Sequence, residues 1–250
     1  MANSASGDSV IGRVMRIIDS FSEDRTVQTV SEIGRRARLP PSTAHRMIGE
    51  LVANGILERD AEHRVRLGMR LWELALRGST ALKLRQAALP YMERVQSAIR
   101  EHTQLAVLEQ EEALCLEQLS DPNAGANATR ITGRLPLHAS SSGLVLLAHA
   151  DARLRERVLA APLRRVGPGT ITDPSRLRRT LDEIRRVGRV VAPASIEEVS
   201  TGVAVPVRSA GAVIAALSVV LPRERPPGAA IEELVVAARG IERSLSTSTR

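Results

Sequence analysis

Polar side chains on one face of a predicted helix have the types and spacing that read DNA. Ser42, His45 and Arg46 recur at intervals of three and four residues, which places them on one side of an α-helix, opposite an apolar stripe. Arg46 suits a guanine edge or a phosphate, and His45 suits a base edge. Ser42 and Thr43, at the helix start, suit the DNA backbone, because hydroxyls and helix N-termini both bind phosphate. The alternative is a set of solvated surface side chains.

Two arginines in a short predicted strand offer a second set of contacts. Arg64 and Arg66 alternate with Val65 and Leu67, so both arginines project from one face of the strand. They are placed to straddle a phosphate backbone or to enter the minor groove. Taken singly, each is equally well explained as a solubilising surface charge.

A run of serines at the start of a later predicted helix has the chemistry of an anion site. Ser140, Ser141 and Ser142 precede Gly143. Free amides and the positive end of the helix dipole favour an anionic oxygen there, and the hydroxyls add donors. We predict a small organic ligand, either a carboxylate or a compact aromatic or aliphatic metabolite. Its apolar part is expected to lie on Leu135, Val203 and Val220. The alternative is that the serines only cap the helix.

The same serine run resembles a nucleophile elbow with Ser141 at its centre. Pro136 interrupts the strand that should lead into such an elbow, and the histidines of this region have no obvious acidic partner. A metal-sensing site is the other alternative, but the histidines are scattered and Cys115 is alone, without ligand spacing. We therefore expect no catalytic residue, no metal and no cofactor.

The elements around the first two sets of residues predict a winged helix-turn-helix over residues 8–68. Residues 10–21 carry a helical apolar stripe, and Thr29 and Glu32 form a capping box that opens a second helix. A third helix runs from about Ser42 to Asn54, and two short strands follow at residues 56–59 and 64–67. Helix, helix, tight turn, helix and hairpin is the order of a winged helix-turn-helix.

The rest of the chain predicts a linker helix and a second domain of α+β type. The linker, residues 69–82, carries Leu71, Trp72, Leu74 and Ala75, which makes it too apolar for a free linker. We expect it to pack against its twin in a dimer. In residues 83–250, a helix that starts afresh or kinks at Pro90 is followed by strands and helices in mixed order. The strands are predicted at 106–108, 114–119, 129–132, 189–192, 203–207 and 213–221, and the helices at 141–148, 152–159, 174–187 and 229–245.

The composition is that of a folded protein with few means of stacking on bases. Of 250 residues, 43 % are hydrophobic and 25 % charged, which argues against wholesale disorder. One Phe, one Trp and one Tyr are too few for aromatic stacking platforms. The single cysteine excludes an internal disulfide and fits a reducing compartment. With no apolar signal core and no membrane-spanning run, the chain is expected in the cytoplasm.

The net charge of +7 lies mostly outside the predicted DNA-binding region. Residues 1–80 hold 12 arginines and ten acidic residues, whereas residues 153–189 hold 11 arginines and four acidic residues. A basic excess is typical of proteins with an anionic partner. Here it falls on helices of the second domain, where a solvated arginine-rich face is the simpler interpretation and an acidic partner is the alternative.

Several segments, in order along nearly the whole chain, resemble the IclR-type transcriptional regulators. They are residues 39–46, 51–60, 133–143, 184–188, 202–207 and 215–219. The resemblance implies a dimeric or tetrameric repressor or activator that binds a double-stranded DNA operator. It also implies a GAF-like C-terminal α/β domain that binds a small effector. The effector-binding positions then fall on Leu135, Ser140, Ser141, Ser142, Gly202, Ser218 and Val220.

The sequence departs from the family pattern at three places. The wing turn, residues 60–63, lacks the glycine common there, and Leu144 stands where lysine is frequent. Residues 190–193 are apolar where a polar or acidic residue is often found. We therefore expect a more apolar effector pocket.

Overall fold

The computed structural model describes residues 9–22, 24–121, 124 and 133–247. The chain divides into two compact units, residues 1–80 and 81–250. The strand predicted at residues 129–132 lies outside the described residues. No helix among the described residues is long and apolar enough to cross a membrane.

The first unit is a three-helix domain with a small sheet. Helices α1 (Val10–Ile18), α2 (Val30–Arg36) and α3 (Pro41–Ala53) enclose an apolar core. Strands β1 (Val27–Gln28), β2 (Leu57–Arg59) and β3 (Val65–Leu67) form an antiparallel sheet in the order β1-β3-β2. The hairpin of β2 and β3 is the predicted wing. Strand β1 was not predicted, because two residues are too few to show an alternating pattern.

Local signals in the sequence explain the helix boundaries of this unit. The predicted capping box is confirmed: the Thr29 hydroxyl accepts from the Glu32 amide at 3.3 Å, and the Glu32 carboxylate accepts from the Thr29 amide at 2.8 Å. Helix α3 begins at Pro41, one residue before the predicted start, because proline suits the first helical position. Helix α4 (Met69–Gly78) follows the wing as expected.

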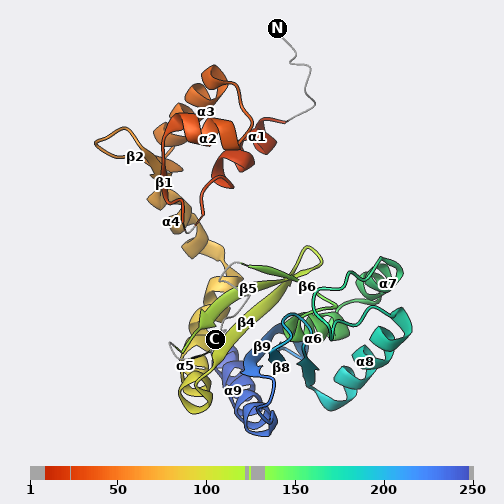
Figure 1. Ribbon diagram of the computed structural model, residues 1–250. Helices are drawn as coiled ribbons and strands as arrows, with labels where there is room; N and C mark the ends of the chain where they lie inside the picture. The colour runs from red at the N-terminus through yellow and green to blue at the C-terminus, as the bar shows by residue number, and fades with distance from the viewer. Residues whose placement is uncertain (1–8, 23, 122–123, 125–132, 248–250) are drawn as a thin grey trace. The chain divides into compact units, whose positions relative to one another are not determined.

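The second unit is a six-stranded antiparallel sheet with helices on both faces (Figure 1). Its strands are β4 (His102–Glu109), β5 (Glu112–Leu119), β6 (Arg134–Pro136), β7 (Val190–Pro193), β8 (Ser200–Ser209) and β9 (Ala212–Pro222), in the order β6-β5-β4-β9-β8-β7. Helices α5 (Thr80–Ile99) and α9 (Gly228–Thr247) pack on one face. Helices α6 (Ser141–His149), α7 (Ala152–Ala160) and α8 (Pro174–Val187) pack on the other. The predicted α+β architecture is confirmed.

The sequence predicts that the helix starts afresh or kinks at Pro90 and that Pro136 interrupts a strand. Helix α5 runs on through Pro90 and does not start afresh there. Pro136 lies within β6, which is an edge strand, where a missing amide donor is tolerated. Helix α5 also begins at Thr80, inside the segment assigned to the linker.

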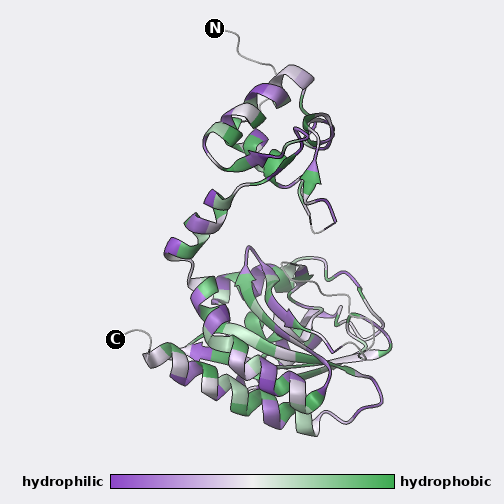
Figure 2. Cartoon of the chain, turned by 90° about the vertical axis from the view of Figure 1, so that its left-hand side faces the viewer, coloured by the Kyte–Doolittle hydropathy of each residue, from purple (hydrophilic) through white to green (hydrophobic). Residues whose placement is uncertain are grey.

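Helix α6 is the most enclosed element of the second unit. Residues 141–148 are all buried between the sheet and α8. Along the outer helices of the second unit, hydrophobic and hydrophilic residues follow one another (Figure 2). The buried start of α6 is the place where the predicted effector residues meet.

Candidate DNA-reading helix and effector pocket

Helix α3 exposes the face that the sequence predicts to read DNA. Ala44 and Met47 are buried in the core of the first unit, whereas His45 and Arg46 are exposed on the other side. Arg46 Nη1 lies 2.7 Å from Glu50 Oε1, and the two side chains are 64 % and 61 % exposed. Such an exposed pair contributes about 1 kcal/mol or less. Arg46 can therefore exchange this carboxylate for DNA at low cost.

The start of α3 has the properties of a phosphate site. Its N-cap residue is Pro40, which makes no side-chain cap hydrogen bond. Among the described residues, nothing accepts from the amides of Ser42 and Thr43, and their hydroxyls have no partner either. These donors point out of the helix start, where the helix dipole also favours an anion.

The wing arginines are held by acidic residues of the wing itself. Arg64 lies 2.9 Å from the Asp60 carboxylate and 3.1 Å from that of Glu62. Arg66 lies 3.1 Å from the Glu58 carboxylate, directly across the β2–β3 ladder. The Met69 amide and then Arg66 donate to Glu58 and lower the pKa of its carboxyl. The sequence analysis did not foresee this neutralisation of both cations.

In the wing turn, which lacks glycine, a histidine adopts a left-handed conformation. His63 has a φ of 60°, a left-handed conformation that glycine adopts without cost. Asp60 Oδ1 accepts from the amides of Glu62 and Arg64 at 3.1 and 2.8 Å, and these bonds hold the turn closed. The tip of the wing is therefore a closed turn without glycine.

A small cavity of about 40 Å³ lies where α6 begins, against β8 and β9 of the sheet. It is closed on one side by the loop between β7 and β8, which contributes Ser195, Ile196 and Glu197. Six of the seven predicted effector positions line it: Leu135, Ser140, Ser141, Ser142, Gly202 and Val220. The seventh, Ser218, does not line the cavity, but its hydroxyl accepts from Ser142 Oγ at 2.8 Å.

The serines at the start of α6 have separate tasks. Ser140 is the N-cap, and its hydroxyl accepts from the Gly143 amide at 3.0 Å. Ser142 is engaged with Ser218. Ser141 Oγ has no hydrogen-bond partner among the described residues, and neither do the amides of Ser141 and Ser142. The Ser141 hydroxyl and the amides of Ser141 and Ser142 are therefore available to a ligand. Of the three serine side chains, only that of Ser140 caps the helix.

Gln104 is a pocket residue that the sequence analysis missed. It lies on β4 beside Ser218 of β9, is 4 % exposed, and lines the cavity. Its side-chain Nε2 is buried without a hydrogen-bond partner in the part of the chain that the structure describes. An unpaired buried amide costs about 1–3 kcal/mol, so a ligand oxygen that accepts from it gains a strong partner. No local signal marked it, because Gln104 follows two other polar residues, His102 and Thr103, at the start of β4.

His138 makes a hydrogen bond outside the effector cavity. His138 is 8 % exposed, and its Nε2 lies 2.9 Å from the Arg164 carbonyl oxygen. This hydrogen bond fastens the segment before α6 to the chain beyond α7. His138 does not line the cavity.

Both units match domains of known regulators. The IclR helix-turn-helix domain matches residues 10–61, and the bacterial transcriptional regulator IclR C-terminal domain matches residues 79–247. The chain belongs to the IclR family of transcriptional regulators. The winged helix-turn-helix is therefore its DNA-binding domain, and the alternative of an enzyme with Ser141 as nucleophile is excluded.

Three known proteins show how far the similarity to IclR regulators extends. An IclR homolog from Microbacterium hydrocarbonoxydans, crystallised with 4-hydroxybenzoate, is 60 % identical, with a TM-score of 0.91 over 96 % of this chain and 100 % of that one. An IclR homolog from Microbacterium sp. strain HM58-2 is 59 % identical, with a TM-score of 0.65 over 96 % and 98 % of the two chains. The regulator XynR of Escherichia coli is 28 % identical over 83 % of this chain and 84 % of its own.

Proposed function

We propose that this IclR regulator responds to an aromatic carboxylate of the 4-hydroxybenzoate type bound at the start of α6. The observation that carries this proposal is the set of unpaired donors around one cavity: the amides of Ser141 and Ser142, Ser141 Oγ and Gln104 Nε2. Donors at a helix start favour a carboxylate. The apolar side chains of Leu135 and Val220 suit an aromatic ring.

The cavity also offers one acceptor. Glu197 lines it from the β7–β8 loop, and its carboxylate accepts a hydrogen bond from a neutral hydroxyl but repels a second carboxylate. A ligand with a carboxylate at one end and a phenolic hydroxyl at the other meets both requirements. The complex of the 60 % identical homolog with 4-hydroxybenzoate supports this choice of ligand.

The effector must displace part of the pocket in order to bind. A cavity of about 40 Å³ holds roughly three waters, since each needs about 10–15 Å³, and 4-hydroxybenzoate is larger. We assign this movement to the β7–β8 loop, because it closes one side of the cavity with Ser195, Ile196 and Glu197. Movement of this loop is the conformational response to the effector.

Calorimetric titration of the full chain with 4-hydroxybenzoate tests the effector proposal. Benzoate, which lacks the hydroxyl, and 4-hydroxybenzyl alcohol, which lacks the carboxylate, are the matched ligands. We expect 4-hydroxybenzoate to bind more tightly than either. If both truncated ligands bind as tightly as 4-hydroxybenzoate, the assignment of its two ends is wrong.

On the DNA side, we propose that Ser42, Thr43, His45, Arg46, Arg64 and Arg66 form the contact surface. His45 and Arg46 are assigned to bases, and the free donors of Ser42 and Thr43 to a phosphate. Arg64 and Arg66 are assigned to the backbone beside the recognition helix, where they exchange wing carboxylates for phosphates. Selection of binding sites from random duplexes by the purified protein gives the operator sequence on which these assignments are tested.

We further propose that the protein acts as a homodimer, formed in part through α4. Met69, Trp72, Leu74 and Leu76 of this helix are between 47 % and 61 % exposed, an unusual concentration of large apolar side chains on one short helix. A twin helix is the simplest cover for them. Two linked winged domains would then read two half-sites of one operator.

A further inference from the structure

A cleft of about 620 Å³ runs along the free edge of the large sheet, between β7 and α8. Strand β7 is the last strand of the sheet, and the whole of it lines the cleft. From α8 the lining side chains lie on one face of the helix, at Arg176, Thr180, Ile184 and Val187. The cleft is distinct from the effector cavity, although Ala192 and Ser195 line both.

The backbone of β7 offers unused hydrogen-bonding groups to this cleft. The Ala194 amide donates to the Ser200 carbonyl at 2.8 Å. Along an antiparallel ladder, every second residue directs its backbone N–H and C=O toward the neighbouring strand. The backbone groups of Ala192 and Val190 therefore also face β8, whereas the N–H and C=O of Val191 point away from the sheet. No described residue bonds to these outward groups. At Pro193, the next outward position, the ring leaves no N–H to donate, and Gly169 packs against the Pro193 carbonyl.

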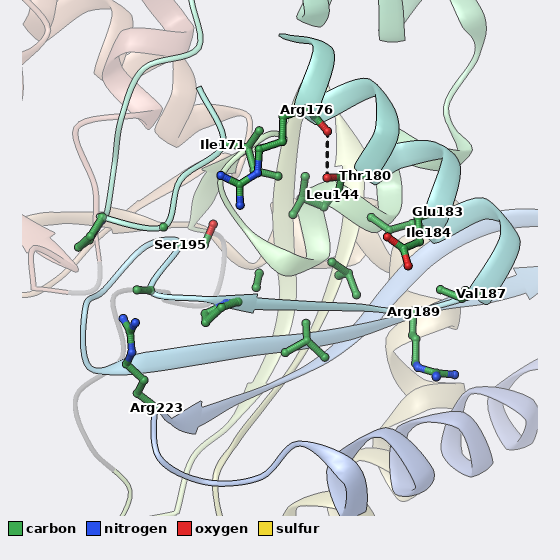
Figure 3. A pocket seen from close by; sticks show the side chains of 17 residues that line it. Leu144, Ile171, Arg176, Thr180, Glu183, Ile184, Val187, Arg189, Ser195 and Arg223 are labelled. Atoms are coloured by element: carbon green, nitrogen blue, oxygen red, sulfur yellow. Dashed lines mark hydrogen bonds between the residues drawn. The ribbon is translucent and has the colours of Figure 1, made fainter. Parts of the chain in front are cut away.

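The cleft is strongly basic. Arg176 of α8, Arg189 just before β7 and Arg223 just after β9 line it; in Figure 3, Arg189 points to the side of β7 that faces away from α8. Among the described residues, no carboxylate pairs with Arg176, Arg189 or Arg223; the Arg223 guanidinium donates to the Glu198 carbonyl at 3.2 Å. The one acidic residue in the lining, Glu183, lies 3.8 Å from Arg186 on its own helix. The arginine surplus of residues 153–189 is therefore partly gathered at a concave site.

We propose that this cleft binds an extended acidic segment of a partner protein as an added strand beside β7. The main chain of the segment pairs with Val191, and its side chains alternate between the side of α8, where Ile184 and Arg176 lie, and the opposite side of the sheet, to which Arg189 points. Acidic side chains complement Arg176 and Arg189, which have no carboxylate partner of their own.

A second copy of this chain is a poorer occupant of the same edge. Pairing of β7 with β7 about a two-fold axis places the same patch on both sides of the interface. The unpaired arginines of one copy would then approach those of the other, and like charges that face each other weaken an interface. The positive charge of the cleft therefore favours an acidic partner over a second copy of this chain.

Fluorescence anisotropy with a labelled peptide of alternating glutamate and valine, titrated with the full-length protein, tests this proposal. We expect micromolar binding. The double variant Arg176→Glu/Arg189→Glu should weaken binding at least tenfold, whereas Arg179→Glu, on the same helix but outside the cleft lining, should change it less than twofold. Absence of binding up to millimolar protein, or equal loss in the two variants, overturns the proposal.

Two further peptides and one exchange measurement separate strand addition from simple charge attraction. A lysine–valine peptide and a glutamate–valine peptide with alternate amides N-methylated should both bind at least tenfold more weakly. Saturating glutamate–valine peptide should slow hydrogen exchange of the Val191 amide severalfold in the unmodified protein, a result that needs no variant to fold. Equal binding of the N-methylated peptide, or unchanged exchange at Val191, shows that the arginines attract anions without forming a strand.

Discussion

Ser141 of α6 and Gly202 of β8 approach so closely that only a hydrogen fits between them. A Cβ atom built on Gly202 lies 2.6 Å from Ser141 Oγ and 3.0 Å from Ser141 Cβ, well inside van der Waals contact. The glycine lets the start of α6 press against the sheet, and this contact places the free amides of Ser141 and Ser142 at the cavity.

The variant Gly202→Ala should therefore damage the effector site more than the fold. The added methyl must push Ser141 aside, and overpacking of this kind costs roughly 1–3 kcal/mol. We expect a lower melting temperature and a loss of 4-hydroxybenzoate affinity of at least tenfold by calorimetry. Gly228→Ala, where a Cβ meets nothing within 4 Å, is the control and should leave both unchanged. Full affinity in Gly202→Ala would show that Ser141 does not hold the ligand.

Replacement of Gln104 should separate stability from binding. Gln104→Leu removes a buried amide that has no partner, so the free energy of unfolding should stay the same or rise by about 1 kcal/mol. Affinity for 4-hydroxybenzoate should fall by tenfold or more, because a donor to the ligand is lost. Gln118→Leu, at a residue outside the cavity lining, serves as the control for binding. If Gln104→Leu binds 4-hydroxybenzoate as tightly as the wild type, the side-chain amide of Gln104 does not contact the ligand.

Arg46 and Arg64 should differ in the way their loss affects DNA binding. Arg46→Ala should cost about 1–3 kcal/mol on the selected operator and relax the preference at one base step in each half-site. Arg64→Ala should weaken all duplexes alike and lower the salt dependence of binding. Its effect should exceed the loss of one phosphate contact, because Asp60 and Glu62 then face the DNA without their cation. Electrophoretic titrations at several salt concentrations distinguish the two patterns.

Trp72 provides a direct test of the dimer. The side chain is 53 % exposed on α4, and it is the single tryptophan of the chain. Its fluorescence should shift to longer wavelength on dilution as the dimer dissociates, and Trp72→Asp should shift the equilibrium toward monomer in light scattering. Arg77→Asp, on the same helix, should leave it unchanged. A wild-type protein that is monomeric at micromolar concentration contradicts this assignment of α4.

His149 should make the protein less stable as the pH falls below about 6.5. Burial, helped by Arg208, Arg185 and Arg155, lowers the pKa of this ring below its ordinary value of 6.5, although its hydrogen bond to the Val145 carbonyl acts in the opposite direction. The unfolded chain therefore takes up the proton first, and stability is lost as the pH falls from the unfolded pKa toward the folded one. His149→Gln should remove this part of the pH dependence.

Chemical unfolding at pH 5.5 and pH 8 measures the effect. The difference in unfolding free energy between the two pH values should be smaller in His149→Gln than in the wild type. An identical difference in both proteins would show that the ring titrates normally in the folded state.

The sequence was sufficient wherever local chemistry sets the structure. Helix α8 was predicted with its true bounds, because Asp173 caps it, Pro174 opens it and Gly188 closes it with a φ of 71°. The exposed face of α3 could be predicted in the same way, from the helical spacing of its apolar residues. Each of these features depends on neighbours within a few residues along the chain.

What the sequence could not show were contacts between distant segments. Gln104 becomes a pocket residue only because β4 pairs with β9 beside Ser218, more than a hundred residues away. The ion pair of Arg66 with Glu58 depends on the register of the wing strands. The basic cleft likewise depends on Arg223, just after β9, which the fold brings to β7 and α8 from much further along the chain.

The complete enclosure of α6 has a consequence for how the second unit folds. A helix whose residues 141–148 are all buried has no side that water can stabilise, so its surroundings must form with it. We infer that the sheet, α6 and α8 assemble in one cooperative step, without a stable intermediate that lacks α6. Shortened forms of this unit that omit α8 should therefore aggregate rather than leave a smaller folded core.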